Sequence, residues 1–192
     1  MRISYNICYC ILRFVFFFVH RFKQTGRENI PDGAVVMCAN HTSLKDPIFM
    51  AFAAGLKYQI RFMAKDELIR APVLGAILKS AGIFGVKRGQ ADLKAIKTAL
   101  SVLKSGGKLG IFPEGHRVGS DEDSDAKNGA IMLAAKTGAA LLPVYIPGEK
   151  KLFGRVNVVI GKPYYLEKFK GNSETYSVYA KELMQKIEEL KP

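Results

Sequence analysis

Hydrophobic and polar residues follow each other along the chain in short blocks, and these blocks predict strands and helices in alternation. Apolar runs of strand character, bounded by Gly, Pro and polar residues, fall at 34–39, 58–63, 83–86, 109–112, 141–146 and 156–160. Helical spacing is found at 47–54, 72–80, 91–105, 127–137 and 173–190, and a short helix opens at 65–67. The alternation predicts an α/β domain with a mixed, largely parallel sheet flanked by helices.

The first 23 residues do not fit this alternation. The segment from Ile3 to Val19 is almost wholly apolar, and no acidic residue occurs before Glu28. At about 100° per residue, its polar members fall within a stripe roughly 60° wide. These members are Arg2, Asn6, Tyr9, Arg13 and His20. A narrow basic stripe opposite a wide apolar surface is typical of a helix that lies in one leaflet, with arginines that reach the headgroups.

Three other interpretations of this segment compete with an interfacial helix. A secretory signal needs small residues at a cleavage site, where this chain has His20-Arg21-Phe22-Lys23. A spanning helix would place Arg13 near mid-bilayer. A first helix that merely covers the core stays open. We favour the membrane, and we divide the chain into an interfacial membrane-anchoring helical region at 1–25 and a catalytic domain at 26–192.

Composition narrows the classes of partner. A chain of 192 residues with 48% hydrophobic content fits one folded domain. Its formal charge of +12 indicates a polyanionic partner: nucleic acid, a phosphorylated ligand or an anionic membrane face. Cys8, Cys10 and Cys38 lack metal-ligand spacing, so we expect no disulfide framework, no zinc site and a reducing compartment.

One candidate for chemistry stands where the strand at 34–39 ends. His41 follows this strand, and Asp46 precedes Pro47 at the predicted start of a helix. Open α/β sheets place ligands at the carboxyl ends of their strands. A carboxylate bonded to one imidazole nitrogen fixes the tautomer and stabilises the protonated ring, so the pair can deprotonate an alcohol. The alternative is a helix-capping Asp beside an ordinary hydrogen-bonded His.

Two further strand ends are basic. Lys87-Arg88-Gly89 follows the strand at 83–86, and Pro113-Glu114-Gly115-His116-Arg117 follows the strand at 109–112. In a parallel sheet these loops meet His41 at one edge, where two guanidinium groups suit bidentate binding of a phosphate. The alternative is that both loops are ordinary solvated turns.

These segments together resemble a known family, the glycerolipid acyltransferases. Asn40-His-Thr-Ser-Leu-Lys-Asp46 resembles their HX4D motif, and the segments at 82–89, 112–117 and 141–146 resemble their second, third and fourth blocks. All four occur in order, within a match from about 26 to 165. His116 replaces the more usual Thr, and Ala126-Lys127-Asn128-Gly129-Ala130 stands where Phe-Lys-x-Gly-Ala is common. The size and N-terminus resemble the compact bacterial 1-acyl-sn-glycerol-3-phosphate acyltransferases.

The resemblance implies transfer of an acyl chain from acyl-CoA or acyl carrier protein to the sn-2 hydroxyl of lysophosphatidic acid. It implies phosphatidic acid as the product, no cofactor and no metal. His41 is then the general base, and Asp46 orients it. We expect no acyl-enzyme, and Ser43 makes a local backbone hydrogen bond. We expect an oxyanion donor among the backbone N–H groups of residues 41–43.

The acceptor site implied by the resemblance is made by the basic loops. Arg88 and Arg117 bind the phosphate, Glu114 and Gly115 belong to the acceptor site, and Lys127 is a lesser phosphate contact. The implied partners are an anionic phospholipid membrane, the lipid acceptor and the thioester donor, without nucleic acid. The implied place is the cytoplasmic face of the cell membrane, as a peripheral or monotopic protein.

Other functions stay in view. An enzyme of the same fold can act on glycerol 3-phosphate or another lysophospholipid. Two alternatives come from different classes: a basic nucleic-acid-binding domain and a non-catalytic membrane adaptor. The first lacks a recognisable nucleic-acid motif and has no need of the apolar N-terminus. The intact His41/Asp46 pair disfavours the second.

Overall fold

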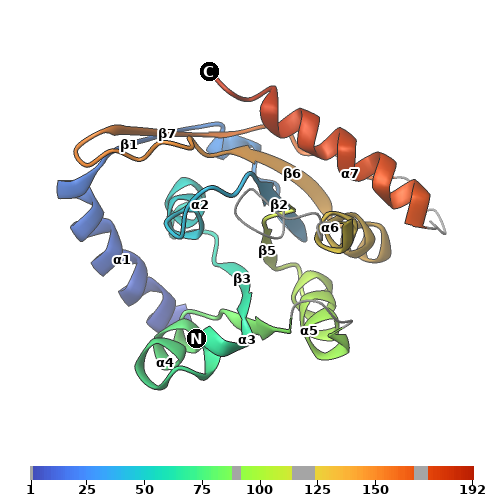
Figure 1. Cartoon of the computed structure of the whole chain (residues 1–192), viewed down its shortest axis with the longest axis horizontal. Helices are drawn as coiled ribbons and strands as arrows, with labels where there is room; N and C mark the ends of the chain where they lie inside the picture. The colour runs from blue at the N-terminus through green and yellow to red at the C-terminus, as the bar shows by residue number, and fades with distance from the viewer. Residues whose placement is uncertain (1, 88–91, 114–123, 167–172) are drawn as a thin grey trace.

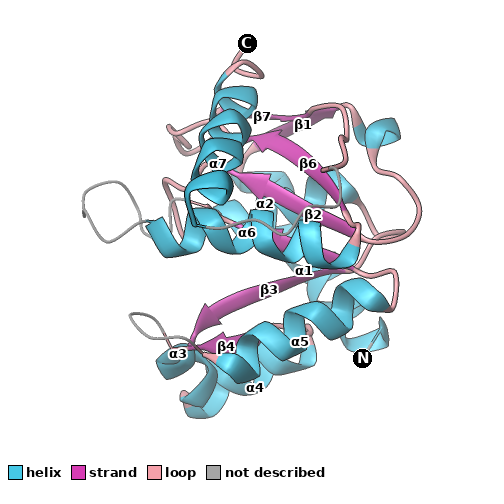
Figure 2. Cartoon of the chain, turned by 90° about the vertical axis from the view of Figure 1, so that its right-hand side faces the viewer, coloured by secondary structure: helices cyan, strands magenta, loops and turns pink. Residues whose placement is uncertain are grey.

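A seven-stranded sheet crosses the protein and carries helices on both of its faces (Figures 1 and 2). The structure is a computed structural model, which describes residues 2–87, 92–113, 124–166 and 173–192. The strands, in chain order, are Arg21–Thr25 (β1), Val35–Ala39 (β2), Ile60–Lys65 (β3), Phe84–Val86 (β4), Lys108–Ile111 (β5), Ala140–Tyr145 (β6) and Arg155–Ile160 (β7). Their order in the sheet is β1-β7-β6-β2-β5-β3-β4.

The direction of the strands decides which loops meet. β6 pairs with β7 antiparallel, whereas the pairs β1/β7, β2/β6, β2/β5, β3/β5 and β3/β4 are parallel. The sheet is therefore mixed and largely parallel, as predicted. Consequently the ends of β2 to β6 lie at the same edge as the beginnings of β1 and β7. Loops from distant parts of the sequence gather at this edge.

Two hydrophobic cores lie on opposite faces of the sheet. Successive residues of a strand point to opposite faces, so Val36 and Met37 of β2 enter different cores. Phe49 and Phe52 of α2 pack on the Met37 face, and α5, α6 and α7 cover the other (Figure 1). The helices are Arg2–Val19 (α1), Asp46–Ala54 (α2), Asp66–Arg70 (α3), Pro72–Ser80 (α4), Leu93–Lys104 (α5), Ser124–Thr137 (α6) and Ser173–Glu188 (α7).

The polar side of α1 faces the protein. Tyr5 is 5% exposed, and Tyr9 meets the ring of Phe52 edge-on, with 5.3 Å between centroids. The guanidinium of Arg13 lies over the ring of Phe22, 5.1 Å from its centroid. The outward side is apolar and comprises Ile3, Ile7, Ile11, Phe14, Val15, Phe17 and Phe18. The expectation that Arg13 reaches outward to headgroups is therefore wrong, because its stem and charge are used against aromatic rings of the core.

No helix within the described ranges combines the length and the apolar character that crossing a bilayer requires.

The N-terminal region differs from the prediction in one element. The segment 1–25 was expected to be helical, but α1 ends at Val19 and residues 21–25 form the edge strand β1. This strand pairs in register with β7, from Arg21↔Arg155 to Thr25↔Val159. The sequence of β1 contains one large apolar residue, Phe22, and therefore lacks the pattern of a strand. It is a strand because it pairs with β7, which lies more than 130 positions later in the chain. The other predicted elements agree with the structure to within a few residues.

Candidate active site

The buried side chain of Asn40 fixes the end of β2 through two hydrogen bonds to the backbone of Ile146, directly after the neighbouring strand β6. Asn40, 6% exposed, donates from Nδ2 to the carbonyl of Ile146 at 2.7 Å and accepts at Oδ1 from the Ile146 N–H at 2.9 Å. The pair of bonds joins the end of β2 to the end of its neighbour β6. The backbone that carries His41 is therefore fixed on the sheet and does not swing as a free loop.

His41 and Asp46 form the hydrogen-bonded pair that the sequence predicted. Nδ1 of His41 lies 2.9 Å from Oδ2 of Asp46. The His41 side chain is 13% exposed, and its ring stacks on Phe112 at the end of β5, with 4.3 Å between centroids. Phe112 belongs to the predicted third block, so the contact brings that block against the first. Two sides of the imidazole are thus held, one by a carboxylate and one by a ring.

The Asp46 carboxylate is fully buried and surrounded by donors. Besides His41, its Oδ2 accepts the backbone N–H groups of Thr42 and Ser43, both at 2.7 Å. Burial alone would raise the pKa of Asp46, but the interactions with His41, Lys150 and the Ser43 N–H outweigh it, so the pKa is lowered. An ionised carboxylate only accepts, so Nδ1 of His41 carries the proton and Nε2 is the basic nitrogen.

Lys150 completes this cluster and was not found from the sequence. Its Nζ lies 2.7 Å from Asp46 Oδ1, and its side chain is only 3% exposed. Nζ also donates to the carbonyl of Pro147 at 2.6 Å and to Thr42 Oγ1 at 3.1 Å. At Asp46 the ammonium acts as a point charge. Lys150 sits in the loop after β6, and β6 neighbours β2, so strand order in the sheet was the missing signal.

Two expectations about the His41 loop have opposite outcomes. Ser43 does make a local backbone contact, since its hydroxyl accepts from the Lys45 N–H at 3.3 Å. However, the N–H groups of Thr42 and Ser43 already donate to Asp46, which removes them as oxyanion donors. The prediction that placed the oxyanion donor at residues 41–43 is therefore wrong for these two groups, because the buried carboxylate needs them.

A second histidine lies beside the cluster. Nζ of Lys45 is 3.5 Å from Nε2 of His20, which is 2% exposed and stands between α1 and β1. Burial, together with the charge of Lys45, lowers the pKa of His20. The end of α1 thus touches the loop that carries the His41/Asp46 pair.

The predicted phosphate-binding residues fall mostly outside the described ranges. Arg88, Glu114, Gly115 and Arg117 belong to residues that the structure does not describe, and Lys127 lies in α6 without a described side chain. The loops that carry the first four start from β4 and β5, at the edge where His41 lies. Their roles remain predictions.

Comparisons with known proteins agree with this fold. Residues 21–147 match the family model described as Acyltransferase. The 1-acyl-sn-glycerol-3-phosphate acyltransferase of Bacillus subtilis is 32% identical, over 97% of this chain and 96% of that protein. A protein of the same name from Streptococcus pneumoniae is 31% identical, over 88% of this chain and 65% of that protein.

A solved structure is similar as well. The 1-acyl-sn-glycerophosphate (LPA) acyltransferase PlsC of Thermotoga maritima aligns with a TM-score of 0.65 and 27% identity, covering 89% of this chain and 72% of that one. The family model spans most of the chain, and the Bacillus subtilis relative matches nearly end to end. This chain belongs to the acyltransferase family.

Proposed function

We propose that the protein transfers a fatty acyl chain from an acyl thioester to the sn-2 hydroxyl of 1-acyl-sn-glycerol 3-phosphate and so forms phosphatidic acid. The observation that carries the proposal is the His41–Asp46 pair, held at 2.9 Å at the sheet edge of a member of the acyltransferase family. The activity for which the Bacillus subtilis and Streptococcus pneumoniae relatives are named supports this choice of acceptor.

The residues of the cluster supply general-base chemistry. Nε2 of His41 takes the proton of the acceptor hydroxyl while its oxygen attacks the thioester carbonyl carbon. The tetrahedral intermediate then expels the thiolate, which receives the proton back from His41. Asp46 stays ionised and stabilises the protonated imidazole, as its lowered pKa requires. The transfer is direct and involves no acyl-enzyme.

The acceptor and donor sites extend this proposal. Arg88 and Arg117 bind the acceptor's phosphate, Glu114 and Gly115 line the acceptor site, and Lys127 adds a lesser contact. The donor is acyl-CoA or acyl carrier protein, and no cofactor takes part. Glycerol 3-phosphate and other lysophospholipids are the competing acceptors of the same chemistry.

We further propose that the protein is peripheral on the cytoplasmic face of the membrane, seated by the outward side of α1. Phe14, Phe17 and Phe18 are 68%, 67% and 59% exposed, an apolar surface that water does not favour. Excess positive charge adds attraction to anionic lipids. Substrate and product are bilayer lipids, so an enzyme in one leaflet exchanges them without carrying acyl chains through water.

The test is acyl transfer by the purified protein in detergent micelles, with labelled acyl-CoA or acyl carrier protein and with each of the three acceptors in turn. We expect phosphatidic acid from wild type and a loss of about 10²–10⁴ in kcat for His41→Ala. Lys97→Ala on the exposed side of α5 serves as the matched control. Transfer by a folded His41→Ala protein at the wild-type rate would remove the pair from the mechanism. Transfer to glycerol 3-phosphate and to neither of the other acceptors would show that glycerol 3-phosphate, and not the lysophosphatidic acid proposed here, is the acceptor.

A further inference from the structure

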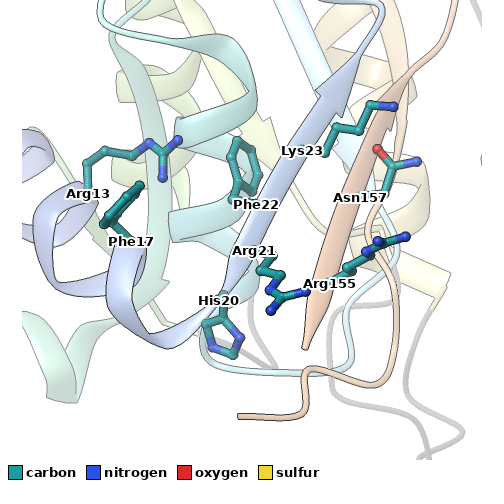
Figure 3. Close-up of a pocket in the computed structure, with 8 residues that line it drawn as sticks. All are labelled: Arg13, Phe17, His20, Arg21, Phe22, Lys23, Arg155 and Asn157. Atoms are coloured by element: carbon teal, nitrogen blue, oxygen red, sulfur yellow. The ribbon is translucent and has the colours of Figure 1, made fainter. Parts of the chain in front are cut away.

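A cavity of about 720 Å³ lies where the end of α1 meets the beginnings of β1 and β7 (Figure 3). Arg21 and Lys23 of β1 and Arg155 and Asn157 of β7 line one side, and Arg13 and Phe17 of α1 line the other. It is not the His41 site, since neither His41 nor Asp46 lines it.

Basic side chains line the cavity, and its lining includes no acidic residue. Arg21, Lys23 and Arg155 join no salt bridge among the described residues, whereas Arg13 lies over the rings of Phe22 and Phe52. Arg21 and Arg155 are register partners on parallel neighbouring strands, and Figure 3 shows their side chains leaving the sheet on the same side. Adjacent like charges repel, so the arrangement favours a bound anion that bridges them.

An apolar rim adjoins these charges. Phe17 lines the cavity and also belongs to the outward side of α1, where its ring meets Phe18 edge-on at 5.4 Å. The loop after β6 is tied to the same place, because the Phe153 N–H donates to the carbonyl of Val19 at 2.7 Å. Leu152 and Phe153 in that loop are 66% and 67% exposed. A cationic cavity beside exposed aromatic rings fits an amphiphile better than a free soluble anion.

The cavity borders the loop of the candidate active site. Arg21 and Arg155 begin β1 and β7, and these beginnings lie at the edge where β2 ends. His20 also lines the cavity, and its Nε2 is 3.5 Å from Nζ of Lys45, the residue before Asp46. A headgroup held here would lie beside the loop that carries His41 and Asp46.

We propose that this cavity binds the phosphate headgroup of an anionic bilayer lipid, whose acyl chains lie against Phe17, Phe18 and Phe153. The lipid held here does not react, so the site goes beyond the proposed acyl transfer and depends on it only through the peripheral attachment. Such a lipid fixes the orientation of the protein in the leaflet, with the His41 edge toward the lipid that does react.

The test compares two charge-matched triple variants. Arg21→Gln, Lys23→Gln and Arg155→Gln remove three cations from the cavity, and Lys94→Gln, Lys97→Gln and Lys104→Gln remove three exposed cations from α5. α5 packs on the face of the sheet opposite α1. Binding is measured by co-sedimentation with phosphatidylcholine vesicles that contain one-fifth phosphatidic acid, and with pure phosphatidylcholine vesicles. A thermal scan without lipid checks that both variants are folded.

We expect the cavity variant to bind anionic vesicles at least about tenfold more weakly than the α5 variant, since general attraction is lost equally by both. Dioctanoyl phosphatidylglycerol, an anionic lipid that is neither acceptor nor product of the proposed transfer, should raise the melting temperature of wild type and not that of the cavity variant. Equal weakening in both variants would reduce the effect to general charge and overturn the site. Equal stabilisation of wild type by inorganic phosphate, lost in the cavity variant, would identify a free-phosphate site in the cavity and overturn the lipid.

Acyl transfer by wild type in micelles keeps the two proposals separate. Selective vesicle binding without transfer would overturn the proposed function and leave this site standing. Acyl transfer by wild type, with equal vesicle binding by the two triple variants, would support the proposed function and overturn this site.

Discussion

Lys150 offers the sharpest test of how the His41/Asp46 pair works, and we predict that Lys150→Met changes both stability and pH dependence. The substitution keeps an unbranched side chain and removes the ammonium that lies 2.7 Å from Asp46 Oδ1 at 3% exposure. Breaking a buried ion pair by removing one partner costs about 3–5 kcal/mol. Asp46 keeps the three donors on Oδ2, so we expect the lower end, about 3 kcal/mol.

In a chain of this length, that loss lowers the melting temperature by about 6–12 °C. The substitution should also change the pH dependence of catalysis. Without Lys150, Asp46 is balanced by His41 alone, so the protonated, inactive imidazole is favoured. The acidic limb of the pH profile of kcat/KM should therefore move to higher pH.

The assay is acyl transfer in micelles between pH 5 and 9, together with thermal unfolding. Lys151→Met is the matched control: this neighbour is exposed, and among the described residues its ammonium pairs with the exposed Glu149, at 3.1 Å. Lys150→Arg should restore the wild-type limb in part, since it keeps the charge. A fall in rate at every pH, with the acidic limb unmoved, would reduce Lys150 to packing and refute the electrostatic reasoning. A Lys150→Met protein as stable as wild type would refute the contribution of the ion pair to stability.

Three other changes test separate parts of the structure. Asp46→Asn should lower kcat by about 10⁴ and should also weaken the pH dependence of stability. Because the pKa of Asp46 is lowered on folding, its ionised form stabilises the protein above the ordinary carboxyl pKa near 4, and this stability is lost on acidification. The free energy of urea unfolding of the Asn variant should therefore fall less than that of wild type as the pH drops below about 4. An equal fall in both proteins would contradict this. Asn40→Ala leaves two groups of Ile146 unpaired and should cost about 2–4 kcal/mol in urea unfolding, and a loss under 1 kcal/mol would show that water replaces the amide. The double variant Phe14→Ser, Phe18→Ser should be released from vesicles, whereas Leu93→Ser, at a similarly exposed position on α5, should stay bound. If the double variant also stays bound, α1 is not the anchor.

The sequence alone carried most of the elements and the central pair. His41 shortly follows the strand Val35–Ala39, and Asp46 begins the next helix, so the two side chains are brought together by local geometry alone. The alternation of apolar runs and helical spacing likewise predicted a mixed, largely parallel sheet, because each element must bury one face or stripe.

Contacts between distant segments were decided by the tertiary structure. Lys150 reaches Asp46 because β6 lies beside β2, although more than 100 residues separate the two. No local pattern distinguishes Lys150 from Lys151, one nearly buried and the other exposed.

The direction of α1 was also beyond the sequence. Helical periodicity defines two sides of α1 but not which side meets the protein, since Arg13 can satisfy either a headgroup or an aromatic ring. The rings of Phe22 and Phe52 settled that choice, and β1 became a strand only because β7 supplied its hydrogen-bonding partner. A sequence determines which surfaces an element has, whereas the packed fold determines what each surface contacts.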